Sequence, residues 1–532
     1  MLYYMLNFQK KEISMDKKLM LGTSAIAQGA IEAGISYASS YPGTPATQIL
    51  EYVAQNSSVK AEWSVNEKVA YEVAYGVSLV GRRVLCSMKH VGLNVASDPF
   101  MTSAYLGVRG GFVLVIGDDP NAYSSQNEQD SRFYASFAKI PCLEPSDNQE
   151  AKYMTFLAFD ISEELGLPVM IRSLTRLLHC YAPVKIGSVK EEKPLKIEKD
   201  PEHMIAVPKH VVNLHKELNA KQKKIHELIK KYEFNRIYPG KSKKGIIACG
   251  ITFQYAMELN KKFPILKISG YPVDETLLKE FTAGLDEVYV FEEGYPFIEK
   301  LVRCFHPNVK GKISGDLSME GELGINSIMK LFNKTKNINY DVDKYLIPRP
   351  PFLCPGCPHR EFYKALIEAK PNFITGDIGC YTLGANPPLN ALDTCLCMGA
   401  SISMASGIRS QGVKRVVAVI GDSTFIHTGV PALINSVYNK SNILICILDN
   451  SSVAMTGHQP TPAIGITAKG DETKKLDLAE LCKACGADNV EVVDPYDKKA
   501  TFEALYRGLN NQGVNVVIAK RACVLIARKL KS

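Results

Sequence analysis

The stretch RVVAVIGDS, which begins at Arg415, and the later stretch ILICILDNSS, which begins at Ile443, decide the fold. Each is a short apolar run that stops abruptly at polar residues. The interval between them is long enough for a crossover helix, so the pattern predicts two buried parallel strands. Ligands of open α/β sheets bind at the carboxyl ends of strands, so Asp422 and Asn450 are placed to share one cation.

The residues at these strand ends suit a metal-bound phosphate group. Magnesium prefers oxygen ligands and is usually shared with phosphate oxygens. A helix that begins after Gly421 offers backbone N–H groups to the same phosphates. A Gly-Asp pair followed one crossover later by Asn resembles the thiamine diphosphate signature, although Ser423 stands where that signature has a second Gly. A strand-end Asp and Asn arising by chance is the alternative interpretation.

Composition bounds the class of protein. With 532 residues, 46% of them hydrophobic, the chain is long enough for about two to four domains. The net charge of +8 is modest, and the sequence has no basic face interleaved with aromatic residues. Nucleic-acid binding is therefore not expected. No apolar run reaches the roughly 18 residues of a membrane span, so no membrane role is expected. Fourteen cysteines without a secretory signal predict a reducing, cytoplasmic location. Met15 is an alternative start, because a patterned strand follows it.

Hydrophobic patterns divide the chain into three α/β regions and one connector. Residues 15–180 alternate strand-like and helical patterns, which predicts a parallel sheet. Residues 181–243 are rich in Pro and Lys and then carry apolar residues at helical spacing, which predicts a linker and an amphipathic helix. Residues 244–335 form a smaller α/β region, and residues 350–526 contain the Asp422 and Asn450 site. The clearest predicted strands outside the last region are 84–87, 111–117, 167–172, 245–248 and 287–291.

Thiamine chemistry needs a second element, a carboxylate that hydrogen-bonds N1′ of the aminopyrimidine ring and so assists loss of the C2 proton. That carboxylate is expected in the first region. Glu67 is the best candidate, because it opens a predicted helix in the segment EWSVNEKVAYEVAYGVSLVG. A Glu in the first turn is also favoured simply by the helix dipole. Glu62 and Glu72 are competing assignments.

Several segments together resemble a known family. They are YPGTPATQI from Tyr41, MKHVGLNVASDPFM from Met88, DDPNAYSSQNEQDSR from Asp118, CPGCPHR from Cys354 and GDIGCYTLG from Gly376. They resemble the alpha subunits of indolepyruvate ferredoxin oxidoreductases, within the 2-oxoacid:ferredoxin oxidoreductase family. The resemblance implies three parallel-sheet domains of the thiamine diphosphate-binding, transketolase-like type. Their order is pyrimidine-binding, transketolase C-terminal-like and diphosphate-binding.

The same resemblance implies an activity and partners. The expected reaction is oxidative decarboxylation of aryl pyruvates such as indolepyruvate to aryl-acetyl-CoA and CO2, with ferredoxin as electron acceptor. The expected partners are a smaller beta subunit in a hetero-oligomer, a ferredoxin or a separate iron–sulfur protein, the 2-oxoacid and CoA. A non-oxidative thiamine-dependent decarboxylase is the second hypothesis, and a non-catalytic scaffold subunit is the third.

Site residues follow from the resemblance position by position. Asp422, Asn450 and the backbone carbonyl of Ser452 match magnesium ligands, and Gly421 and Ser423 belong to the same cofactor-binding turn. Glu67 matches the carboxylate that activates the pyrimidine. Four further residues lie in or beside the matching motifs and are candidates for substrate contact, although a structural hydrogen-bonding role is the alternative for each: Thr44, His90, Arg132 and His427. Arg132 is chemically suited to this role because a guanidinium holds a carboxylate in two parallel hydrogen bonds.

The cysteines predict an iron–sulfur site only in part. Cys354, Cys357 and Cys380 match positions that hold a [4Fe–4S] cluster in related oxidoreductases, but four thiolates are normally needed. The fourth is expected near 492–496, where the sequence reads VVDPY. The remaining candidates are Cys395, Cys397, Cys482 and Cys485, and a purely structural set of cysteines is the alternative. The usual C-terminal ferredoxin-like module is not expected, because the chain ends at RACVLIARKLKS.

Overall fold

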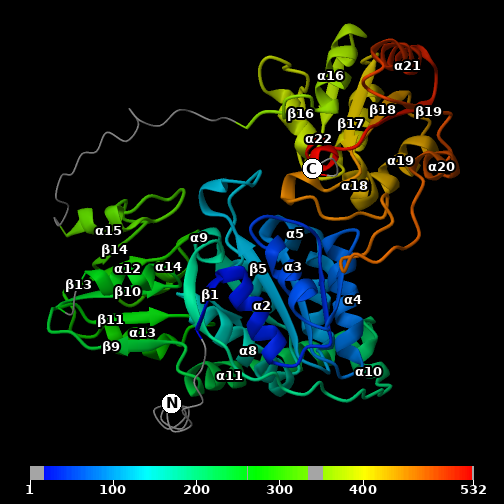
Figure 1. The fold of residues 1–532 in the computed structure, drawn as a ribbon. Helices are drawn as coiled ribbons and strands as arrows, with labels where there is room; N and C mark the ends of the chain where they lie inside the picture. The colour runs from blue at the N-terminus through cyan, green and yellow to red at the C-terminus, as the bar shows by residue number, and fades with distance from the viewer. Residues whose placement is uncertain (1–16, 260–261, 333–350, 530–532) are drawn as a thin grey trace. The chain divides into compact units, whose positions relative to one another are not determined.

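The computed structural model describes residues 17–259, 262–332 and 351–529. It confirms the predicted α/β class, with three large sheets whose neighbouring strands are mostly parallel. The chain divides into two compact units, Met1–Asn339 and Tyr340–Ser532, and each is described by itself (Figure 1). The predicted boundaries at 15, 335 and 350, and the alternative start at Met15, lie outside the described residues.

The first unit is built on a seven-stranded sheet with strand order β12-β6-β7-β5-β4-β2-β3. All neighbours run parallel except β12 and β6. The central strands β4, β5 and β7 are buried along their whole length, which explains why the sequence shows continuous rather than alternating apolar runs. The strands are β2 (Tyr37–Ser40), β3 (Lys60–Trp63), β4 (Val84–Lys89), β5 (Phe112–Asp118), β6 (Cys142–Leu143), β7 (Val169–Leu174) and β12 (Gly270–Tyr271).

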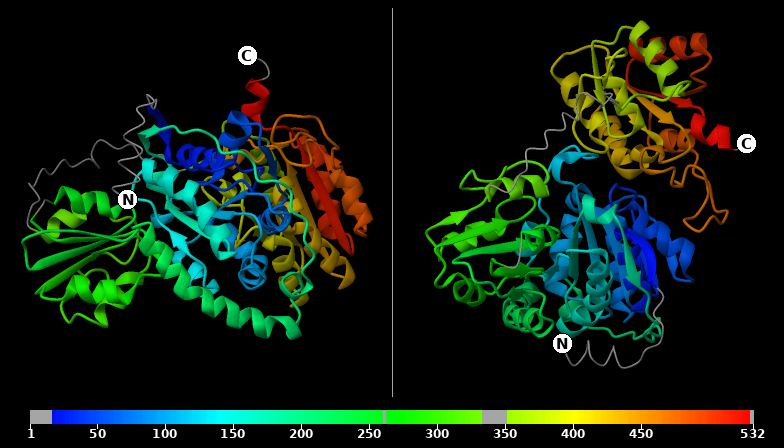
Figure 2. Two further views of the ribbon diagram at one scale, coloured as in Figure 1. Left: turned by 90° about the horizontal axis from the view of Figure 1, so that it is seen from below. Right: turned by 60° about the vertical axis from the view of Figure 1, so that its left-hand side comes forward.

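Helices pack on this sheet and connect its strands (Figure 2). They are α2 (Gly22–Glu32), α3 (Thr47–Asn56), α4 (Glu67–Leu79), α5 (His90–Val95), α6 (Ser97–Leu106), α7 (Arg132–Ala138) and α8 (Asn148–Leu165). Helix α2 packs so closely on α8 that a Cβ on Gly29 would lie 2.2 Å from the Lys152 carbonyl oxygen. Strands β2, β4 and β5 are parallel neighbours, so the turn at 41–45, the start of α5 and the loop 119–131 lie along the same edge of the sheet.

The connector, residues 181–243, packs against the rest of the first unit. Strand β8 (Tyr181–Lys185) pairs antiparallel with β1 (Lys17–Leu21) in a two-stranded ribbon. The extended segment after β8 bonds back to the sheet domain, for example from Lys196 N to the Val80 carbonyl. The long helix α11 (Pro208–Lys231) then packs against α6 and α8. Its buried residues recur at helical spacing, as predicted for an amphipathic helix: Leu214, Leu218, Ile225, Leu228 and Ile229.

A smaller five-stranded sheet has the order β14-β13-β10-β11-β9, and only β9 runs antiparallel to its neighbour. Its strands are β9 (Arg236–Tyr238), β10 (Lys244–Cys249), β11 (Ile265–Ile268), β13 (Glu287–Phe291) and β14 (Val309–Lys310). Strand β12 comes after β11 in the chain but joins the seven-stranded sheet, where Tyr271 pairs with Cys142. The chain therefore passes from one sheet into the other, which was not predicted.

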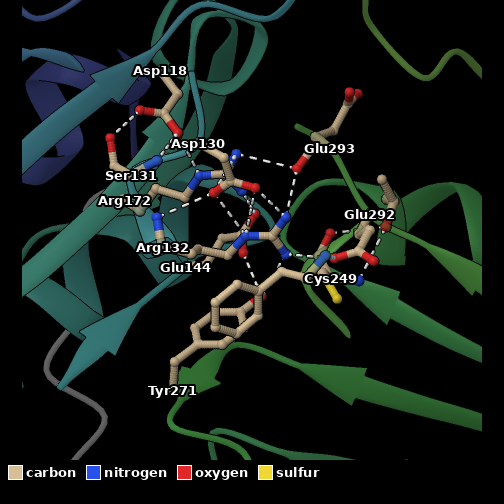
Figure 3. A network of polar contacts seen from close by, with 12 residues as sticks. Asp118, Asp130, Ser131, Arg132, Glu144, Arg172, Cys249, Tyr271, Glu292 and Glu293 are labelled. Carbon is tan, nitrogen blue, oxygen red and sulfur yellow. Dashed lines mark hydrogen bonds and ion pairs between the residues drawn. The ribbon is translucent and has the colours of Figure 1, made fainter. Parts of the chain in front are cut away.

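A buried ion network also joins these two sheets (Figure 3). Arg172 on β7 bonds Asp118 and Glu144 at 2.8 and 2.5 Å. Its Nη2 donates to the carbonyl of Glu293, which comes after β13. Buried charges are stable only when paired and hydrogen-bonded, so this network fixes the junction of the two sheets.

The second unit contains a six-stranded, fully parallel sheet with the order β16-β15-β17-β18-β20-β19. Its strands are β15 (Phe373–Gly376), β16 (Thr394–Cys395), β17 (Val416–Gly421), β18 (Ile443–Asp449), β19 (Asn489–Val493) and β20 (Val514–Lys520). Strands β17 and β18 are neighbours, as predicted, and α19 (Val430–Tyr438) lies between them in the chain. Among the described residues, no helix combines the length and low polarity of a membrane span.

Candidate functional site

The ends of β17 and β18 bring the predicted cation ligands to one edge of the sheet. Gly421 pairs in register with Leu448, so Asp422 and Asn450 come directly after neighbouring strands. The Asp422 side chain is only 3% exposed, and its Oδ2 has no hydrogen-bond partner within the described part of the chain. Asn450 is also buried, and its Oδ1 accepts a 3.1 Å bond from Ser452 N. The three predicted magnesium ligands therefore lie at two adjacent strand ends.

The electrostatics of this edge favour a cation. Burial, together with the neighbouring carboxylate of Asp449, raises the pKa of Asp422 to about 8. A buried carboxylate with an unsatisfied oxygen gains most from a positive charge, so the donor set fits a divalent cation. The described residues contain no group of three His, Cys, Asp or Glu side chains arranged to hold a metal. The fit therefore rests on one carboxylate, one amide and one backbone carbonyl.

His359 is a neighbour of this site that the sequence analysis missed. It lies in the first turn of α16 (Pro358–Glu368), and its Nε2 is 3.5 Å from Asn450 Nδ2. Complete burial lowers the pKa of His359 to about 4, so the imidazole is neutral at physiological pH. His359 lies in the motif CPGCPHR, whose cysteines indicated an iron–sulfur cluster rather than a histidine beside the magnesium site.

The turn after β17 is tightly packed. A Cβ on Gly421 would lie 2.5 Å from Tyr381 Cε1, so only glycine fits there. The helix continues through a π-helical turn, Phe425–Gly429, a geometry that is frequent at functional sites. His427 lies in this turn, is buried, and has Nδ1 3.2 Å from Thr428 Oγ1. Its predicted contact with substrate stays a prediction.

Glu67 opens α4 in the first unit and is 5% exposed. A Cβ on Gly92 would lie 2.6 Å from Glu67 Oε1, so the first turn of α5 lies directly against the carboxylate. The competing residues have other environments. Glu62 accepts bonds from Ser64 and from the Tyr37 hydroxyl, whereas Glu72 is exposed and pairs with Lys68. Burial at the sheet edge favours Glu67, although its role stays a prediction.

Three segments surround this edge beside Glu67. Thr44 is half-buried in the turn after β2, and its carbonyl accepts a 3.3 Å bond from Ser124 Oγ. His90 is 1% exposed; its Nε2 is 3.2 Å from the Asn127 carbonyl oxygen, and its Nδ1 has no partner among the described residues. The loop 119–131 thus contacts both predicted substrate residues.

Arg132 has a different environment from the one its predicted role needs. Its guanidinium is fully buried and bonds Asp130 (2.5 Å), Glu292 (2.9 Å) and the carbonyls of Glu293 and Tyr295 (Figure 3). These partners already use the donors that a substrate carboxylate would need. The geometry therefore favours a structural role for Arg132 at the junction of the two sheets.

Comparison with known proteins places the chain in a family. Residues 28–228 match the family described as pyruvate flavodoxin/ferredoxin oxidoreductase, thiamine diP-bdg. Residues 377–519 match thiamine pyrophosphate enzyme, C-terminal TPP binding domain. Indolepyruvate oxidoreductase subunit IorA of Archaeoglobus fulgidus is 41% identical over 553 residues, which cover 98% of this chain and 89% of that relative. The proteins of the same name from Pyrococcus abyssi and Methanothermobacter thermautotrophicus are 42% and 41% identical and cover 96% of this chain; the matches span 86% and 87% of those relatives.

The chain belongs to the IorA family of indolepyruvate oxidoreductase subunits. This membership and the two thiamine-binding matches confirm the predicted class, a thiamine diphosphate-dependent 2-oxoacid oxidoreductase. The non-oxidative decarboxylase is not favoured. Glu67 lies within the first matched segment, and Asp422 and Asn450 lie within the second.

The three cysteines predicted for a cluster, Cys354, Cys357 and Cys380, lie near enough to affect one another's pKa, and Cys523 joins them. Burial raises the pKa of Cys357 to about 11 and that of Cys380 to about 12, and the thiols of Cys354 and Cys523 add to both shifts. Cys523 was not among the predicted fourth ligands; its backbone N–H donates to the Asn450 carbonyl at 3.0 Å. At the predicted position, the Tyr496 hydroxyl bonds the carbonyl of Gly356 in the CPGC loop. Cys523, distant in the chain, is thus the fourth cysteine that acts on this group, although the described residues contain no three such side chains arranged to hold a metal.

Proposed function

We propose that this chain is the thiamine diphosphate-binding subunit of an enzyme that oxidatively decarboxylates aryl pyruvates to aryl-acetyl-CoA and CO2, with ferredoxin as acceptor. The relatives named indolepyruvate oxidoreductase subunit IorA support the substrate class. The single observation that carries the proposal for the site is the buried Asp422 carboxylate, whose Oδ2 is unpartnered in the described structure, beside Asn450.

In this proposal the strand ends of the second unit hold the diphosphate. Asp422, Asn450 and the carbonyl of Ser452 would ligate Mg²⁺, and the turn of Gly421 and Ser423 would lie beside the phosphates. His359 would hold Asn450 in place as a neutral ring. When bound, thiamine diphosphate supplies the carbon nucleophile that attacks the keto group and accepts the electrons released with CO2.

The first unit would supply proton chemistry and substrate contacts. Glu67 would hold a proton at N1′ of the aminopyrimidine, and its burial would keep water away from that hydrogen bond. Thr44, His90 and, from the second unit, His427 are the proposed substrate contacts. Arg132 is omitted, because its guanidinium is already paired inside the protein.

A direct assay tests the proposed reaction. The chain, co-purified anaerobically with its small subunit, should convert indolepyruvate and CoA to an acyl-CoA while reducing a viologen dye. Pyruvate should be a poor substrate in the same assay if the aryl group is recognised. Release of an aldehyde without dye reduction would contradict the oxidative reaction and support the decarboxylase.

The cysteines need a separate test. Cys354, Cys357, Cys380 and Cys523 are the proposed ligands of a [4Fe–4S] cluster, but no electron-transfer step is assigned to them because the described residues contain no ready metal-binding group. Anaerobic protein should carry about four irons, as one [4Fe–4S] centre requires. Cys523→Ala should lose them, whereas Cys482→Ala, which alters a buried thiol on α20 (Leu478–Ala484), should keep them. Iron-free protein with full oxidative activity would contradict the cluster.

A further inference from the structure

Lys89 is a buried cation without an ion-pair partner among the described residues. It is the last residue of β4 and is 6% exposed. Its Nζ donates to the Ser124 carbonyl at 2.5 Å and lies 3.4 Å from Ser124 Oγ, and no carboxylate of the described residues comes within ion-pair distance. Lys152 and Lys267, which are buried to a similar degree, pair with Glu32 and Glu150. A desolvated ammonium lacking a counter-charge is costly, so this lysine is a candidate for a functional site.

The position of Lys89 links it to the candidate site. A Cβ on Gly43 would lie 3.2 Å from Lys89 Cβ, so the lysine side chain runs beside the turn that carries Thr44. Ser124, whose carbonyl accepts the hydrogen bond from Lys89, donates its own hydroxyl to the Thr44 carbonyl. The next residue along the chain is His90, which opens α5. Lys89 therefore lies between two residues already proposed to contact substrate.

We propose that Lys89 binds the carboxylate of the 2-oxoacid substrate, beside Thr44. This inference rests on the proposed function. A carboxylate ligand would provide the counter-charge that Lys89 lacks, and a charge-assisted hydrogen bond in a desolvated site is among the strong ones.

Other cations near this edge are already engaged. The guanidinium of Arg132 bonds Asp130 and Glu292, and that of Arg176 bonds Glu322 at 2.6 Å. Burial lowers the pKa of Lys89 to about 8, and Asp119 opposes that shift. Asp119 is itself held by Ser124 N at 2.9 Å and Thr175 Oγ1 at 2.8 Å, so it orders the loop rather than pairing with the lysine.

The alternative is that Lys89 only anchors Ser124 and its loop. The two roles differ in charge dependence, so the test compares a carboxylate with its neutral counterpart. Binding of hydrocinnamate and hydrocinnamamide to the thiamine diphosphate- and Mg²⁺-loaded complex would be measured by calorimetry, without turnover. The wild-type complex should prefer the carboxylate, and Lys89→Gln, which keeps a donor for the Ser124 carbonyl, should lose that preference by on the order of 10- to 100-fold.

Two variants act as controls. Lys89→Arg keeps the charge and should keep the preference, and Lys152→Met removes a buried lysine that pairs with Glu32 and should also keep it. An unchanged preference in Lys89→Gln would overturn the proposal, as would wild-type protein that binds both probes equally or binds neither. Because this readout needs no catalysis, a complex that prefers the carboxylate but does not oxidise aryl pyruvates would refute the proposed function while retaining the assignment of Lys89.

A pH measurement covers the case in which Lys89→Gln does not fold. Asp119 is the charged group that acts on Lys89; His90 follows the lysine in the chain, and Glu67 lies against Gly92, three residues further on. In the wild-type complex, carboxylate preference should fall as the pH rises through about 8, because Lys89 loses its proton. In Lys89→Arg it should persist above that pH, since a guanidinium stays charged. Equal pH dependence in both proteins would overturn the proposal.

Discussion

Asp422 shows what a single buried carboxylate implies. Its Oδ2 has no partner in the described residues, and the charge of Asp449 adds to the cost of ionising it. We expect Asp422→Ala to abolish Mg²⁺-dependent thiamine diphosphate binding, because the diphosphate would lose its bridging cation. Calorimetry with and without Mg²⁺ measures this. Asp477→Ala, which removes only the N-cap of α20, should lower stability by about 1 kcal/mol and leave binding intact. Tight binding by Asp422→Ala would remove the residue from the site.

Glu67 separates binding from proton chemistry. Glu67→Gln should still bind the cofactor but should slow exchange of the C2 proton by on the order of a hundredfold or more, because an amide does not exchange the N1′ proton as a carboxyl does. Exchange would be followed by NMR in deuterium oxide. Glu72→Gln, on the exposed face of the same helix, should exchange at the wild-type rate. A normal rate in Glu67→Gln would exclude Glu67 from the mechanism.

Glu293 makes stability depend on pH. Burial raises the pKa of Glu293 to about 7. Its folded-state pKa thus exceeds the unfolded value, so its contribution to stability is fully present below the unfolded pKa and is lost as the pH rises through about 7. The loss is on the order of 3 kcal/mol. Urea unfolding should show a smaller fall between mildly acidic and mildly alkaline pH in Glu293→Gln than in wild type. Glu287→Gln, which removes a carboxylate whose pKa is lowered, should keep the wild-type fall, and equal slopes in all three proteins would contradict this role.

At the scale of elements, long buried strands were predictable and short ones were not. Strands β4, β5, β17 and β18 are continuous apolar runs, so the sequence located them within a few residues. Strand β12 has two residues and no periodicity, so nothing local indicated that it leaves one sheet for another. The pairing of Arg132 with residues near β13 depends on that junction, so no local pattern could indicate it. The motif around Arg132 therefore suggested a contact with the substrate carboxylate instead.

The junction provides a test of the role of Arg132. Arg132→Met should leave Glu292 buried without its cation, and Asp130 with only Arg172 at 3.6 Å, and should lower the free energy of unfolding by roughly 3–5 kcal/mol. Arg109→Met breaks a solvent-screened pair with Asp200 and should lower the free energy of unfolding far less. Denaturant unfolding of both variants measures the difference. If Arg132→Met instead kept its stability but raised the KM for the 2-oxoacid, the substrate role would be supported.

For the whole molecule, candidate site residues could be named from the sequence where they lie at the ends of strands and helices. Asp422, Asn450 and Glu67 each stand next to a recognisable element, so their motifs alone indicated a cofactor. Lys89 was overlooked because a lysine before a histidine in a motif carries no sign of burial. Cys523 was overlooked because its proximity to Cys357 arises only when β20 brings the end of the chain beside β18. Properties that depend on packing between distant segments were thus beyond local patterns.

The largest-scale prediction concerns a second subunit. Relatives of the chain are named as subunits. We therefore expect the isolated chain to bind thiamine diphosphate but to show little oxidative turnover. Co-expression with a smaller subunit should restore aryl pyruvate-dependent dye reduction, because the partner would complete the assembly that retains substrate and CoA. Turnover per bound cofactor, measured with and without the partner, tests this, and the complex carrying Glu67→Gln, which should still bind the cofactor, is the slow control. Full ferredoxin-linked activity of the isolated chain would contradict the prediction, as would failure to co-purify any small subunit from native cells.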